Sequence, residues 1–169
     1  MTIESTEQQN TTESAITYSE CYSLLSLIPK EQIENVFNQR ECDIDIEFLG
    51  FIDIYKKLSE IIPKHFTIVD LGCAYNPQCF YFKDHKKYIA VDISDCEKFK
   101  SENCEIYNKS IEDFIREDIS GLNLDETFAI CSYVPPWGGD NRKMVRESFK
   151  NQFVYYPHIE YSVRITNCT

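Results

Sequence analysis

Two short segments carry the residues that could do chemistry. The first, VDLGCAYN (residues 69–76), has an acid and a glycine directly after an apolar run. Gly72 permits a positive φ and a close approach of a ligand to the backbone. The second, VDIS, places Asp92 twenty residues beyond Gly72, the separation at which an acid reaches a cofactor ribose in dinucleotide-type folds. Together they predict a turn that binds a nucleoside-containing cofactor.

These residues also have a purely structural interpretation. A strand that ends in Asp-Leu-Gly can be only a strand end, and Asp92 can cap the turn that follows its own strand. Two such ends in this order and separation favour the ligand-binding interpretation. Asn76 and Pro77 are typical of a helix N-cap and a first-turn proline, so the first turn should lead into a helix.

The pairing of VDLGCAYN with YIAVDIS resembles the class I S-adenosylmethionine-dependent methyltransferase superfamily. The first motif of that superfamily reads acid-x-Gly-x-Gly-x-Gly, and its second motif ends a strand with an acid. The resemblance covers roughly residues 64–157 and rests on motifs alone. The chain departs from the pattern at the second and third glycines, where it has Ala74 and Asn76. Alanine is the least intrusive substitute, and asparagine tolerates a left-handed conformation.

The resemblance implies a cofactor and the residues that would contact it. A nicotinamide dinucleotide would need its pyrophosphate against a glycine-rich turn. S-adenosylmethionine has no phosphate, so a turn with one glycine suits it better. Asp70 and the loop at Gly72 would line the methionine end of the cofactor. Asp92 would contact its ribose, and the segment at Ser110, after the third strand, would contact the edge of its adenine. The implied contact residues are Asp70, Gly72, Ala74, Tyr75, Asp92 and Ser110.

Two of these residues keep a second interpretation. Ser110 begins SIED, which is also a capping box at the start of a helix. Tyr75 is bulky enough either to close over a small ligand or to fill the space that a ligand would use.

The segment CSYVPPWGGDN, residues 131–141, would face the transferred methyl group in this superfamily. Its VPPW is similar to the Pro-Pro-aromatic motif of methyltransferases that act on exocyclic base amines, in which the aromatic side chain stacks on a flipped base. Those enzymes have Asp, Asn or Ser before the prolines, whereas this chain has Val134, which cannot accept a hydrogen bond. The candidates for orienting an acceptor are Tyr75, Ser132, Tyr133 and Trp137, and a rigid non-catalytic loop that packs Trp137 is the alternative.

The elements that must position these residues can be read from the apolar pattern. Five short strands, FTIVDL, YIAVDI, CEIYN, FAICS and QFVYYP, alternate with helical or turn segments. This alternation predicts an α/β fold: a Rossmann-like three-layer sandwich with a mostly parallel sheet of five or six strands. Asp70 and Asp92 should then lie at the carboxyl ends of neighbouring strands. The last twelve residues, HIEYSVRITNCT, allow one further strand.

The first third of the chain is predicted to be a polar tail and a helical cap. Residues 1–17 have the polar bias of a disordered tail. Residues 18–63 contain two short helices, 18–28 and 30–39, separated by Pro29, and a packing helix at 46–61 with Phe48, Ile52, Tyr55 and Leu58 near one face. Residues 64–169 form the methyltransferase-type core, in one domain with 18–63.

The composition of the chain limits the kinds of molecule that it can bind and the compartment in which it is expected. The formal net charge of −11 disfavours direct binding of a nucleic-acid backbone and permits a protein partner with a basic surface. No apolar run is long enough for a membrane span, and no secretory signal is present, so a cytoplasmic location is expected. Eight scattered cysteines without a CxxC pair favour reduced thiols and no metal site.

Two functions therefore remain open. The first is an S-adenosylmethionine-binding methyltransferase-like protein with an unknown acceptor. The second is a non-catalytic module or inhibitor with the same fold, which engages a protein partner through its acidic surface.

Overall fold

The fold is an α/β sandwich built on one sheet. The computed structural model describes residues 2–5, 46–74, 77–94, 100–132, 134, 140–156 and 160–166. Its elements follow in the order β1 (Thr2–Ser5), α3 (Ile46–Ile61), β2 (Thr67–Leu71), the 3-10 helix η1 (Pro77–Phe82), β3 (Lys87–Val91), β4 (Cys104–Tyr107), α4 (Ile111–Glu117), η2 (Ile119–Gly121), η3 (Leu124–Glu126), β5 (Thr127–Ser132), α5 (Asn141–Ser148), β6 (Asn151–Tyr156) and β7 (Glu160–Thr166). The strands of this described part form a seven-stranded sheet in the spatial order β1-β7-β6-β5-β2-β3-β4.

The centre of the sheet is parallel. Strands β4, β3, β2, β5 and β6 pair in parallel, whereas β7 is antiparallel to β6 and β1 is antiparallel to β7. From β2 the chain moves outward through β3 to β4, then crosses back to β5 on the other side of β2. The carboxyl ends of β2 and β5 are therefore a topological switch point, the place where open α/β sheets bind ligands.

This sheet confirms the largely parallel arrangement predicted from the sequence. The five predicted strands are β2 to β6, and the last twelve residues supply β7 as the further strand, which makes six. The seventh strand, Thr2–Ser5, comes from the segment predicted to be a tail and pairs with β7 from Thr2 opposite Thr166 to Ser5 opposite Val163. This pairing covers backbone groups that an open edge of β7 would leave without partners.

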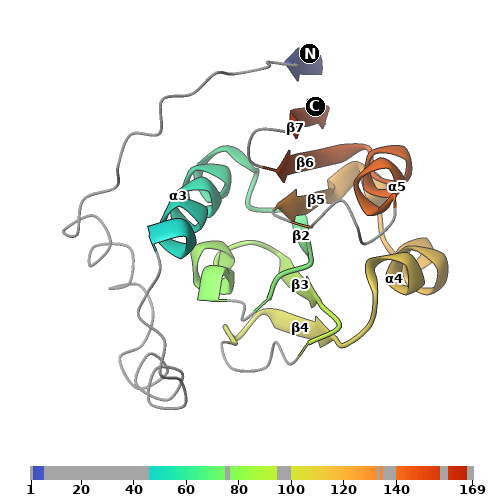
Figure 1. The fold of residues 1–169 in the computed structure, drawn as a ribbon, viewed down its shortest axis with the longest axis horizontal. Helices are drawn as coiled ribbons and strands as arrows, with labels where there is room; N and C mark the ends of the chain where they lie inside the picture. Colours follow the sequence, from blue (N-terminus) through green and yellow to red (C-terminus); the bar gives the residue numbers. More distant parts are fainter. Residues whose placement is uncertain are drawn as a thin grey trace.

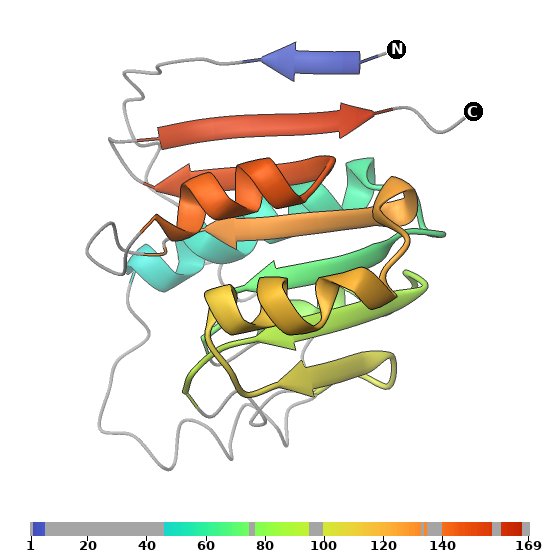
Figure 2. The same cartoon turned by 90° about the vertical axis from the view of Figure 1, so that its right-hand side faces the viewer.

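Helices cover both faces of the sheet. In Figure 1, α3 lies on one side of the strands and α4 and α5 lie on the other. Figure 2 looks onto the face covered by α4 and α5, with α3 behind the sheet. Along β2, Ile68 packs in the apolar cluster beneath α3 and η1, and Val69 and Leu71 pack in the cluster beneath α4 and α5. Because both faces are buried, the strand reads as an almost continuous apolar run.

The packing helix has the predicted boundaries. Helix α3 spans Ile46–Ile61, and its Tyr55 and Leu58 are buried against the sheet, as the helical spacing predicted. The side chains of Phe48 and Ile52 lie outside the described residues.

Other expectations for the N-terminal third also lie outside the described residues. These are the helices at 18–28 and 30–39 and the part of the predicted tail from residue 6 onward. Within the described residues, no helix combines the length and the apolar composition that crossing a membrane would require.

Candidate functional site

The loop after β2 is held against the end of β3. The backbone N–H groups of Gly72 and Cys73 both donate to the carbonyl oxygen of Val91, at 2.8 and 3.2 Å. Gly72 has a φ of 78° and Ala74 a φ of 51°, so the chain turns sharply through left-handed conformations at both positions. Ala74 then donates its N–H to Oδ2 of Asp92 at 2.8 Å. The two segments singled out in the sequence are therefore in direct contact.

Asp92 joins the ends of three strands. It follows β3 directly, which places it at the carboxyl end of the strand beside β2, as predicted. Its Oδ1 accepts hydrogen bonds from the backbone N–H and the hydroxyl of Ser94, at 2.8 and 2.6 Å. Asn108, just after β4, donates its side-chain amide to the carbonyl oxygens of Asp92 and Ser94 at 3.1 and 2.7 Å. Asp92 is partly exposed.

Ile93 lies beside the candidate site and was not singled out from the sequence. Its side chain is 77% exposed, directly after Asp92. This side chain offers an apolar surface beside the carboxylate of Asp92. The signal in the sequence was an isoleucine placed one residue beyond the acid that ends a strand.

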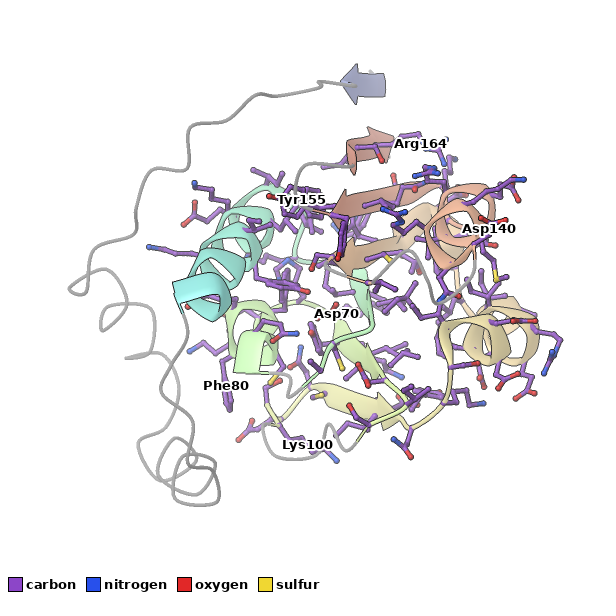
Figure 3. All side chains as sticks on the ribbon, viewed as in Figure 1. Asp70, Phe80, Lys100, Asp140, Tyr155 and Arg164 are labelled. Carbon is purple, nitrogen blue, oxygen red and sulfur yellow. The ribbon has the colours of Figure 1, made fainter. Side chains whose placement is uncertain are left out.

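Asp70 is buried beneath this loop, on the face of the sheet that α3 and η1 cover. None of its surface is exposed, and Figure 3 shows it inside the fold. The Tyr55 hydroxyl donates to its Oδ1 at 3.2 Å, the Gln78 amide donates to its Oδ2 at 2.8 Å, and the Tyr88 hydroxyl also donates to Oδ2. Burial raises the pKa of Asp70 from 3.8 to about 6, although these three hydrogen bonds favour its charged form.

Gln78 connects this buried acid to the loop. Its Nε2 also donates to the carbonyl oxygen of Cys73 at 2.8 Å. Cys73 O and the carboxylate are both acceptors, so the amide nitrogen must be the atom that faces them. Asp70 was expected beside the methionine end of a cofactor; in the structure it acts on the loop through Gln78 and presents no exposed atom.

Val134 closes the other side of the loop. A Cβ added to Gly72 would lie 2.7 Å from Cγ2 of Val134, which is itself buried in the cluster beneath α4 and α5. Gly72 is therefore required by its positive φ and also by the valine packed against it. The position before the prolines thus contributes packing and no hydrogen-bond acceptor.

The remaining predicted residues have different surroundings. Ser132 is buried, and its Oγ lies 2.7 Å from the Tyr55 hydroxyl. Ser110 is the N-cap of α4, because its side chain accepts the backbone N–H of Asp113 at 3.0 Å; the capping interpretation is confirmed. Tyr75, Tyr133 and Trp137 lie outside the described residues.

The described residues contain no group of three or more His, Cys, Asp or Glu side chains that could hold a metal ion. Cys73, Cys79, Cys104 and Cys131 are buried and do not form disulfides with one another. The candidate site is therefore a backbone turn with one carboxylate and one apolar side chain beside it.

The fold defines the class of protein as an α/β chain with a Rossmann-like sheet. No family model matches the chain, and no curated protein matches it. One similar solved structure is named "Putative Type II Methyltransferase" from Anaeromyxobacter dehalogenans, with 16% sequence identity and a TM-score of 0.43. The alignment covers 62% of this chain and 47% of that chain, so this chain spans about half the length of that structure.

Proposed function

We propose that this chain is an S-adenosylmethionine-binding, methyltransferase-like protein. The observation that carries the proposal is the contact between Ala74 N–H and Asp92 Oδ2, 2.8 Å apart, with Ile93 exposed beside it. It brings a left-handed turn, a carboxylate and an apolar side chain together at the carboxyl edge of the sheet. That edge is where the topology favours a ligand.

Each of these groups suits one part of the ligand. The Asp92 carboxylate accepts hydrogen bonds from ribose hydroxyls, one of which takes the place of the Ser94 hydroxyl on Oδ1. Ile93 packs against the adenine ring. The exposed turn at Ala74 leaves the backbone accessible to the methionine end. The absence of phosphate from S-adenosylmethionine fits a turn with a single glycine.

Ile93 gives the sharpest test, because its exposed side chain contributes little to folding. In the proposed complex Ile93→Ser removes an apolar contact of roughly 1.5 kcal/mol, so the affinity for S-adenosylmethionine measured by isothermal calorimetry should fall about tenfold. Ile61→Ser is the matched control: Ile61 is also exposed, at 59%, but it lies at the end of α3, six residues before β2 begins. Equal affinities for the two variants would remove Ile93 from the site.

Asp92 tests the ribose contact. Asp92→Asn keeps an oxygen acceptor for the Ala74 N–H and removes the charge, so it should weaken binding about tenfold while the circular dichroism spectrum stays unchanged. Asp84→Asn, which removes an exposed charge just before β3, should leave the affinity unaltered. Binding that is insensitive to Asp92→Asn would show that the ribose is held elsewhere.

The second candidate function is a non-catalytic module with the same fold. Two described residues favour it: Val134 packs against Gly72, and the Ser132 hydroxyl is engaged by Tyr55 inside the core. Nine of the 28 acidic residues but only two of the 17 basic residues fall within residues 1–45. A basic protein partner would therefore meet the strongest negative charge in that N-terminal part. A folded wild-type chain that gives no heat and no thermal shift with S-adenosylmethionine would favour this function.

A further inference from the structure

Three polar side chains lie in a row inside the core, across the switch point of the sheet. Asp70 belongs to β2, Tyr55 to α3 and Ser132 to β5. The Tyr55 hydroxyl lies 3.2 Å from Asp70 Oδ1 and 2.7 Å from Ser132 Oγ. All three residues are at most 2% exposed. The row therefore connects the carboxyl ends of two neighbouring strands without contact with solvent.

The Tyr55 hydroxyl has one hydrogen and can donate it in only one direction. When Asp70 is charged, its carboxylate has only acceptors, so Tyr55 donates to Oδ1 and Ser132 donates to Tyr55. When Asp70 is protonated on Oδ1, the acid donates to Tyr55, and Tyr55 donates to Ser132. One proton on Asp70 thus reverses two hydrogen bonds.

The proton goes to Oδ1 because of what surrounds the other oxygen. Oδ2 accepts from Gln78 Nε2 and from the Tyr88 hydroxyl. An amide nitrogen can only donate, so Gln78 cannot reverse its bond. A proton on Oδ2 would require the Tyr88 hydroxyl to accept it and to turn its own hydrogen away from Asp70. A proton on Oδ1 keeps both bonds to Oδ2, and Tyr55 can then donate to Ser132 Oγ, 2.7 Å away.

We propose that Asp70, Tyr55 and Ser132 form a proton-controlled hydrogen-bond relay that joins the carboxyl ends of β2 and β5. The proton state of Asp70 sets whether the Ser132 hydroxyl donates to Tyr55 or accepts from it. Through Gln78, the same carboxyl also holds Cys73 O in the loop. The relay therefore couples pH to the ends of β2 and β5, which lead into Gly72 and Val134 beside the candidate site, whether or not the ligand there is S-adenosylmethionine.

Several titratable groups face Asp70 from the elements packed around it. They are Tyr55 on α3, Tyr88 on β3, the thiols of Cys73 and Cys131, and the carboxylate of Asp92. Burial raises the pKa of both tyrosines well above 10 and that of Cys131 to about 12, so these three stay protonated near neutral pH. Burial raises the pKa of Asp70 to about 6, so Asp70 can change its charge close to neutral pH.

A double-mutant cycle on the titration midpoint of Asp70 tests the relay. The midpoint is read from the carboxyl ¹³C resonance of Asp70 in the full chain. Tyr55→Phe removes a donor to the charged form and should raise the midpoint. Ser132→Ala should raise it too, by at least about 0.3 pH units, because Ser132 polarises the Tyr55 hydroxyl although it does not touch Asp70. In the Tyr55→Phe background, Ser132→Ala should cause no further change in the titration midpoint of Asp70.

Two further variants complete the experiment. Ser59→Ala is the matched control, because Ser59 is a buried serine of α3 whose hydroxyl donates to the Lys56 carbonyl oxygen at 2.6 Å. This variant should leave the titration midpoint of Asp70 unchanged. Ser132→Cys keeps a weak donor of similar volume and should give a smaller shift than Ser132→Ala, which covers the case in which the alanine variant does not fold. The relay would be overturned if the titration midpoint of Asp70 were unchanged in both Ser132 variants. It would also be overturned if Ser132→Ala shifted the midpoint equally in the wild-type chain and in the Tyr55→Phe variant.

Discussion

The buried carboxyl of Asp70 should make stability depend on pH in an unusual direction. Its pKa is raised from 3.8 to about 6 in the folded chain. Between these values the folded state holds a proton that the unfolded state has released, so the free energy of unfolding falls as pH rises through this window. A difference of roughly two pKa units corresponds to about 3 kcal/mol over the full window. Above the folded pKa this contribution is fully lost.

Asp70→Asn isolates this effect, because asparagine resembles the neutral acid and cannot ionise. The sequence pI of about 4.7 sets the lower practical limit, since solubility is poorest there. Between pH 5 and pH 8 the ionisation of Asp70 alone should lower the free energy of unfolding of the wild-type chain by ~1.4 kcal/mol. The free energy of unfolding of the variant, minus that of wild type, should therefore rise by this amount from pH 5 to pH 8.

Urea titrations followed by circular dichroism at a series of pH values measure this difference, and the contributions of the other titrating groups cancel in it. Asn at position 70 still accepts from Tyr88 or Gln78, so the variant should keep the fold. A difference that stays constant from pH 5 to pH 8 would show that the pKa of Asp70 is not raised by folding, because Asp70 would then ionise in the folded chain as it does in the unfolded one.

Three further predictions concern packing and helix ends. Gly72→Ala should lower the free energy of unfolding by about 2 kcal/mol or more, since alanine is strained at a φ of 78° and its Cβ meets Val134 at 2.7 Å. Adding Val134→Ala to this variant should recover part of the loss in urea titrations. No recovery would contradict the contact between positions 72 and 134. Ser110→Ala should cost about 1 kcal/mol in thermal unfolding, whereas Ser110→Asp, which keeps an N-cap acceptor, should not. Arg164 donates to the carbonyl oxygens of Arg146, Phe149 and Lys150 at 3.1, 2.8 and 2.9 Å, so Arg164→Gln should cost about 1 to 2 kcal/mol. Arg164→Lys should not restore the loss, and full restoration would show that charge alone matters.

The sheet was largely predictable because its strands are buried on both faces. FTIVDL and FAICS carry apolar residues at successive positions, and both lie in the centre of the sheet as β2 and β5. The helix at 46–61 was predictable from its apolar spacing. Strand β1 was not, because TIES is short and its pairing depends on the edge of β7, more than 150 residues away.

The candidate site was predictable only where neighbouring strand ends meet. The spacing of Gly72 and Asp92 predicted their approach, and the Ala74–Asp92 hydrogen bond joins the two segments. The surroundings of Asp70 could not be read in the same way, because Tyr55, Gln78 and Tyr88 reach it from three separate elements. The exposure of Ile93 likewise depends on how its turn is held by Asp92 and Asn108.

The central claim is that the turn at Ala74, with Asp92 and Ile93, binds S-adenosylmethionine. A calorimetric titration of S-adenosylmethionine into the full-length wild-type chain tests it most directly. Saturable binding to one site per chain is expected, with a gain of about 2.7 kcal/mol in the free energy of unfolding at a free ligand concentration near 100 times Kd. Folded protein that shows neither heat nor stabilisation at millimolar S-adenosylmethionine would contradict the account.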